Sequence, residues 1–124
     1  PQSGTWYQVT DQGAREGNYL ESSATALFIY TLAKAVNKGY IGKDYIQPTR
    51  KAFDGMVKTF TRLEEDGSYT ITNCCAVAGL GGDSKRYRDG SFEYYISEPI
   101  IENDPKSVGS FILAAIEYEK MTKK

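Results

Sequence analysis

The sequence contains no histidine among its 124 residues. This absence excludes the Ser-His-Asp triad, the usual zinc sites and the commonest general base of enzymes. The formal net charge is only -1, so the chain has no general electrostatic field that would attract nucleic acid or an acidic membrane. We therefore expect neither nucleic acid nor a membrane as a partner.

Long apolar runs are also missing. The longest, residues 24–30, is far too short to span a bilayer, and nothing near Pro1 has the pattern of a signal peptide. Pro1 is not an initiator residue, and the residues after it read as the middle of a polypeptide. We expect a piece of a longer protein, which leaves the compartment open.

Cysteine is scarce and its placement is unusual. Cys74 and Cys75 are adjacent, and neighbouring cysteines rarely pair because a bridge would strain the peptide between them. Two thiols alone do not make a zinc site. We interpret both as small strand residues that point to opposite faces, and we predict no metal site.

Aromatic residues are abundant by contrast, with ten tyrosines and one tryptophan. Such amphipathic rings suit sugar faces and interfaces, and they also fill cores. The count therefore favours carbohydrate binding only slightly.

Two segments in the first half have the apolar spacing of helices. The first runs from about residue 21 to residue 38, with Ser22 or Ser23 as N-cap and Gly39 as its end. The second begins near Asp44 or Gln47 and continues to residue 62. The short link 39–42 between them predicts an αα-hairpin.

A third helix is predicted after the polar loop that follows Pro99. Asp104 is its expected N-cap, Pro105 occupies the first helical position, and the helix extends to about residue 121. Its predicted core stripe consists of Val108, Phe111, Ile112 and Ala115.

The segment between the second and third helices is predicted to be a small β-insert. Residues 64–67 form a turn, residues 68–77 alternate as in a strand, and glycines at 79, 81 and 82 end that strand. The aromatic run 91–96 is the expected antiparallel partner.

Five segments, taken in order, carry a family resemblance. They are GTWYQV, REGNYLESSA, VAGLGG, YRDGSFEYYISEPI and NDPKSVGSFILA. Together they resemble the C-terminal part of the unsaturated rhamnogalacturonyl hydrolases of glycoside hydrolase family 105, which are close relatives of the family 88 unsaturated glucuronyl hydrolases. The resemblance extends from Ser3 to about Glu119. One departure is Ser107, where the family pattern has glycine.

The resemblance implies a mainly α fold, part of an (α/α)6 barrel. Residues 1–124 would be a single C-terminal piece of that domain, with about three helices and a small β-hairpin insert. The expected protein partner is the remainder of its own barrel or a second copy of the chain.

The resemblance also implies a reaction. In the family, an aspartic acid protonates the C4=C5 double bond of a Δ4,5-unsaturated uronic acid at the non-reducing end of pectin-derived oligosaccharides. Water adds at C5, and the resulting hemiketal opens and releases the rest of the saccharide without a metal or other cofactor. The catalytic aspartate lies in the N-terminal half of the barrel, so we assign no catalytic residue to this chain.

By the same resemblance, the loop before the last helix faces the unsaturated oligosaccharide substrate. Asn103, Asp104 and Lys106 are the first candidates, with Lys106 placed to meet a uronate carboxylate as a point charge. Asp104 is equally explained as an N-cap, and Lys106 as a solvated lysine.

Three further residues are candidates for substrate binding. Glu98 is placed to bind a sugar hydroxyl or to fix the Pro99 corner, and Trp6 and Tyr19 are stacking platforms or packing residues. The competing function is a non-catalytic helical module that binds carbohydrate or another protein.

Overall fold

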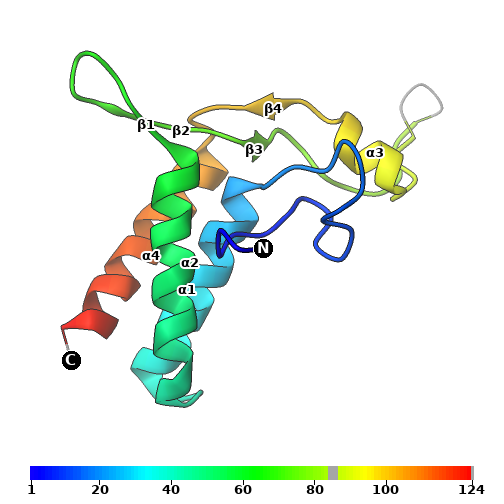
Figure 1. The fold of residues 1–124 in the computed structure, drawn as a ribbon. Helices are drawn as coiled ribbons and strands as arrows, with labels where there is room; N and C mark the ends of the chain where they lie inside the picture. Colours follow the sequence, from blue (N-terminus) through cyan, green and yellow to red (C-terminus); the bar gives the residue numbers. More distant parts are fainter. Residues whose placement is uncertain (84–86, 124) are drawn as a thin grey trace.

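Three long helices stand side by side beneath a layer of loops and short strands in the computed structural model, which describes residues 1–83 and 87–123 (Figure 1). They are α1 (Ser22–Lys38), α2 (Ile46–Phe60) and α4 (Pro105–Thr122). A 3-10 turn, η1 (Lys43–Tyr45), leads into α2, and a short helix, α3 (Phe92–Ser97), lies in the upper layer. The predicted helices are therefore present, joined in the first half as an αα-hairpin.

Helices α1 and α4 run parallel, although about 70 residues separate them in the chain. The Ser22 and Ser107 hydroxyls are 2.8 Å apart at one end, and Asn37 Nδ2 donates to the Glu117 carbonyl at 2.9 Å near the other. Small buried residues line this contact: Ser22, Thr25, Ala26 and Ala33 on α1, and Ser107, Ser110 and Ala114 on α4. Because such side chains are short, the two helix axes can approach closely.

The ends of α1 and α4 follow the sequence signals with one exception. Gly39 ends α1 in the left-handed conformation, with φ 72°, and Asp104 caps α4 with Pro105 at the start, both as predicted. The N-cap of α1 is Glu21 rather than Ser22 or Ser23, so that prediction is wrong. Both serines lie inside the first turn.

The β-insert consists of two separate pairs of short antiparallel strands. β1 (Thr61–Leu63) pairs with β2 (Tyr69–Ile71), and β3 (Cys74–Cys75) pairs with β4 (Ile100–Ile101). The expected continuous strand 68–77 is interrupted because Asn73 adopts φ 58°, a conformation that asparagine tolerates better than most residues. The second helix stops at Phe60, and the next three residues form β1 instead of its last turn.

The aromatic run 91–96 is helical, so its assignment as a strand is wrong. The Ser91 side chain accepts from the Tyr94 backbone N–H at 3.1 Å and caps α3, and Phe92 is buried beneath the Arg15 guanidinium. A local cap and one buried anchor therefore outweigh the β-propensity of the aromatic residues.

The core lies where the three long helices meet. It is formed by six buried residues, Ala26, Ile29, Ala52, Met56, Phe60 and Ala114. Gly55 on α2 lets the N-terminal segment cross the helix, because a Cβ there would lie 1.8 Å from the Ser3 carbonyl oxygen. No helix in the described part of the chain has the length and apolar character needed to cross a bilayer.

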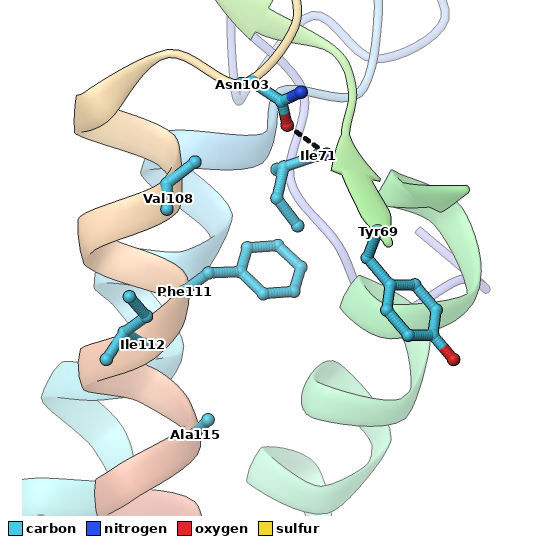
Figure 2. Close-up of a pocket in the computed structure, with 7 residues that line it drawn as sticks. All are labelled: Tyr69, Ile71, Asn103, Val108, Phe111, Ile112 and Ala115. Atoms are coloured by element: carbon cyan, nitrogen blue, oxygen red, sulfur yellow. Dashed lines mark hydrogen bonds between the residues drawn. The ribbon is translucent and has the colours of Figure 1, made fainter. Parts of the chain in front are cut away.

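The predicted core stripe of α4 is confirmed only in part, because Phe111 packs against the core while the fully buried residues lie on another face. Ser107, Ser110, Ala114 and Met121 are buried, whereas Ile112 is 55% exposed. Val108, Phe111, Ile112 and Ala115 instead line one wall of an open groove of about 480 Å³. Figure 2 shows this groove between α4 and β2, with Tyr69 and Ile71 opposite the helix and Asn103 at one end.

Candidate functional site

Three of the six candidate residues, Tyr19, Asp104 and Lys106, lie at the end of the molecule where α1 and α4 begin. The backbone N–H groups of a helix start are unpaired donors and carry a partial positive charge, so this end has two such starts close together. The Ser22–Ser107 contact joins them, and β3 lies across them (Figure 1). We call Glu21, Cys75, Asp104 and Lys106 the helix-start cluster.

Glu21 is the centre of this cluster, although it is not among the residues predicted from the sequence. It is 1% exposed, and its carboxylate accepts from the backbone N–H groups of Ala24 at 2.7 Å, Cys75 at 3.0 Å and Ser23 at 3.1 Å. The Ser23 hydroxyl adds a fourth bond at 2.8 Å. Glu21 therefore caps α1 and ties β3 to it. Glutamate immediately before a Ser-Ser pair is a weak capping signal, since the preferred caps are shorter.

Asp104 and Lys106 form the α4 side of the cluster. Asp104 Oδ1 accepts from the Lys106 backbone N–H at 2.8 Å and from Lys106 Nζ at 2.6 Å, and Lys106 Nζ also donates to the Ala76 carbonyl at 3.1 Å. The Lys106 side chain remains 52% exposed. The lysine is thus held at the helix start while one face of its ammonium group stays open to solvent.

Asp104 and Lys106 each stabilise the charged form of the other. The hydrogen bond from the Lys106 side chain is the main cause that lowers the pKa of Asp104, and the same bond raises the pKa of Lys106. A lowered pKa makes Asp104 a poor general acid, because that role needs a carboxyl group that is protonated at the working pH. Lys106 remains a cation that can meet a carboxylate.

The hydrogen bonds of Asn103 go to β2 and not to the helix-start cluster. It adopts φ 52°, its backbone N–H donates to the Ile71 carbonyl at 2.8 Å, and its Oδ1 accepts from the Ile71 N–H at 2.9 Å. Its Nδ2 donates to Thr70 Oγ1 at 3.4 Å. Asn103 thus extends β2 at the end of the groove (Figure 2).

Glu98 is buried next to a charged partner. Its side chain is fully buried, and its Oε1 is 3.5 Å from Arg88 Nε, so the carboxylate holds an arginine that is 31% exposed. Burial first, and then a hydrogen bond with Glu98, raise the pKa of Tyr94, whose hydroxyl accepts from the Gly79 N–H at 3.1 Å. Glu98 therefore positions Arg88 and Tyr94, which in turn contact the loop that contains Gly79 and Gly81.

The two aromatic candidates occupy different places. Tyr19 lies beside Cys75, and burial first, then a side-chain hydrogen bond with Cys75, raise the pKa of its hydroxyl. Trp6 packs edge-on against Phe28, with ring centroids 5.2 Å apart, and lines a hollow of about 340 Å³ along α1. The structure thus brings the side chains of Tyr19, Asp104 and Lys106 together at the helix-start cluster. The side chains of Trp6, Asn103 and Glu98 make their contacts elsewhere, although the Glu21 N–H donates to the Trp6 carbonyl at 2.9 Å.

Cys74, Cys75 and Ser107 are buried residues that pack within the fold. Cys74 and Cys75 are buried and not bonded to each other, and burial raises the pKa of Cys74 to about 11. Ser107 sits in the first turn of α4 against Ser22, so this position does not require the backbone freedom of glycine. Within the described residues, no three acidic or cysteine side chains lie together as a metal site would need.

Comparison with known sequences places this geometry in a family. Residues 1–122 match the model of Glycosyl Hydrolase Family 88. The chain is 38% identical over 120 residues to Protein Atu3128 of Agrobacterium fabrum and to the 24.9 kDa protein in picA locus of Rhizobium radiobacter. Each match covers 94% of this chain and 52% of the relative, so the chain spans about half the length of these proteins.

Solved structures give the same result. A family 105 glycoside hydrolase from C. acetobutylicum superposes with a TM-score of 0.91 at 46% identity, over 94% of this chain and 32% of that one. A possible family 105 member from Klebsiella pneumoniae gives 0.73 at 28% identity, over 99% and 27%. The expected fold class, mainly α and part of an (α/α)6 barrel, is confirmed. The chain belongs to glycosyl hydrolase family 88.

Proposed function

We propose that this chain is part of an unsaturated rhamnogalacturonyl or uronyl hydrolase. The complete protein would remove a Δ4,5-unsaturated uronic acid from the non-reducing end of pectin-derived oligosaccharides by hydrating its double bond. The observation that carries this proposal is the match to family 88 over residues 1–122. The 46% identity to a family 105 hydrolase supports it.

In this proposal the chain supplies a wall of the substrate pocket. Lys106 is the best placed contact, because Asp104 and the Ala76 carbonyl fix its ammonium group while about half of the side chain is exposed. A lysine fixed in this way loses little further freedom when it binds a uronate carboxylate.

The general acid would come from another part of the complete protein. Asp104 is unsuitable because its pKa is lowered, and Glu21 spends both carboxylate oxygens on α1 and β3. We therefore propose that residues 1–124 are the C-terminal portion of one barrel domain. The rest of that barrel is their protein partner, and the unsaturated oligosaccharide is their ligand.

The test uses the ultraviolet absorbance of the unsaturated uronide, which disappears on hydration. In the complete hydrolase, Lys106→Met should raise KM about 10- to 100-fold with little change in kcat, as expected when a charge-assisted hydrogen bond to bound substrate is lost. Lys106→Arg keeps the charge and should recover part of the loss.

Lys58→Met is the matched control, because Lys58 is an exposed lysine on α2 that lines a different hollow, to which no residue of the helix-start cluster contributes. A Lys106→Met enzyme with unchanged KM would remove Lys106 from the substrate site. A complete protein that binds the saccharide without loss of absorbance would favour the non-catalytic module.

A further inference from the structure

The β1–β2 hairpin holds the two residues that come just before the N-cap of α4. Arg62 and Thr70 are directly opposite each other in the hairpin, so their side chains share one face. On that face, Arg62 Nη1 and Nη2 donate to the two carboxylate oxygens of Glu102 at 2.8 and 2.9 Å. Thr70 Oγ1 accepts from Asn103 Nδ2 at 3.4 Å. At the edge of β2, Ile71 exchanges two further bonds with Asn103, one of which is drawn in Figure 2.

Arg62 itself is fixed by two carboxylates at once. Its Nε donates to Glu64 Oε1 at 2.9 Å, while its two terminal nitrogens hold Glu102. The hydrogen bond with Arg62 lowers the pKa of Glu102, and hydrogen bonds with Thr70 first and then with Arg62 lower the pKa of Glu64. Exposed ion pairs add little stability, but a two-pronged arginine–carboxylate pair fixes direction as well as distance. The arrangement is therefore suited to setting a geometry.

The residues that the hairpin holds lead directly into the helix-start cluster. Asp104 follows them, and its carboxylate caps α4 and bonds to Lys106 Nζ at 2.6 Å. Asn103, immediately before this cap, is left-handed with φ 52°. Such backbone is costly for a residue other than glycine, so it persists where neighbouring contacts impose it. The direction in which the Lys106 ammonium group points thus depends on contacts made by the hairpin.

We propose that Arg62 is a positioning residue for Lys106 and acts through Glu102 and the backbone at the start of α4. With this pair in place, the ammonium group is aimed before a ligand arrives, so binding costs less conformational freedom. Without it, the ligand itself must order the loop. The binding of substrate by Lys106 rests on the proposed function, whereas the hold of Arg62 on the α4 start rests on the contacts of the hairpin.

The first test measures amide hydrogen exchange in the complete protein without substrate. In Arg62→Met, we expect the N–H groups of Asn103 and Lys106 to exchange about 3- to 5-fold faster than in the wild type, because both lie in the stretch that the hairpin holds. The amides of Ala114 and Ala115, in the middle of α4, should keep their rates. Unchanged exchange at Lys106, or an equal rise along the whole helix, would overturn the proposal.

The second test follows turnover of the unsaturated uronide by the complete hydrolase. Arg62→Met should raise KM about 3- to 5-fold with kcat unchanged, and it should have no further effect in a Lys106→Met background. Combining Arg62→Met with Glu102→Gln should be no worse than either change alone, since both break the same pair. The control is Lys120→Met, which removes an exposed ion pair with Glu117 near the other end of α4 and should leave KM unchanged.

A rise in KM that persists without Lys106 would overturn the proposal, because Arg62 would then act on another part of the site. So would an unchanged KM in Arg62→Met when Lys106→Met shows its expected rise. The two tests separate this inference from the proposed function. A complete protein that does not hydrate the uronide, yet shows the local change in exchange, would contradict the proposed function and leave the positioning role of Arg62 standing.

Discussion

At the scale of single residues, a few buried or half-buried carboxylates organise the end of the molecule. Glu21 has the most connections, with four hydrogen bonds that join α1 to β3. Asp104 and Glu98 each hold a cation that is partly exposed. The acidic residues thus act by fixing backbone and positioning Lys106 and Arg88.

Replacing Glu21 by alanine should destabilise the fold. The change removes an N-cap and leaves the buried Cys75 N–H without its acceptor, so we expect a loss of about 2–4 kcal/mol in the free energy of unfolding. Chemical denaturation followed by circular dichroism measures it. Glu65→Ala, at an exposed turn position, is the control and should stay within about 0.5 kcal/mol. An equally small effect at Glu21 would contradict the assigned role.

Asp104 should make stability depend on pH at the acidic end. Its folded pKa is lowered, so its contribution is fully present above the unfolded pKa of about 3.9 and is lost as the pH falls through the folded value. Thermal melts from pH 7 to pH 2 should show the wild type above Asp104→Asn at neutral pH and the two converging in acid. Parallel curves would show that the Lys106 pairing adds no stability.

At the scale of elements, the sequence predicted the long helices well because apolar spacing and caps agree there. Gly39, Asp104 and Pro105 mark their ends correctly. The β-insert was predicted poorly because its strands are only two or three residues long. The left-handed conformation of Asn73 interrupts the expected strand. The Ser91 N-cap favours a helix where the aromatic residues favour a strand.

The site was predictable to a similar extent. Asp104 as a cap and Lys106 near it follow from local chain spacing. The Glu21–Cys75 bond joins residues 54 positions apart, and the Ser22–Ser107 contact joins residues 85 apart. No local pattern reports such contacts, so the helix-start cluster became visible only in the fold.

Two glycines on different helices should respond oppositely to alanine. At Gly55 a Cβ would collide with the Ser3 carbonyl, so Gly55→Ala should destabilise by about 1–3 kcal/mol despite its better helix propensity. At Gly109 nothing lies within 4 Å, so Gly109→Ala should stabilise this chain by about 0.5–1 kcal/mol. Urea unfolding of both variants tests the pair. A stabilising effect of Gly55→Ala would show that the N-terminal segment does not cross α2 as described.

At the scale of the whole molecule, apolar side chains remain uncovered on α1 as well as α4. Leu27 and Phe28 are 48% and 40% exposed. Exposed apolar patches of this kind promote association. The 124 residues on their own are therefore expected to be incompletely protected from water.

The isolated chain should associate and should show no turnover. Light scattering is expected to give a mass that rises with concentration, and Ile112→Lys with Ile116→Lys should reduce that rise because both side chains are exposed on α4. Lys51→Ala with Lys58→Ala, on the polar face of α2, is the control pair. A monodisperse and thermally robust monomer that hydrates the unsaturated uronide would contradict this view.

The parallel packing of α1 and α4 has a consequence for the order of folding. The helix pair with the most extensive contact is also the pair furthest apart in the chain, and the core includes Ala114. Contacts between distant residues slow folding because a long loop must close first. During synthesis, we therefore expect the α1–α2 hairpin to lack part of its core until α4 has emerged. Their shared core closes only after α4 has been translated.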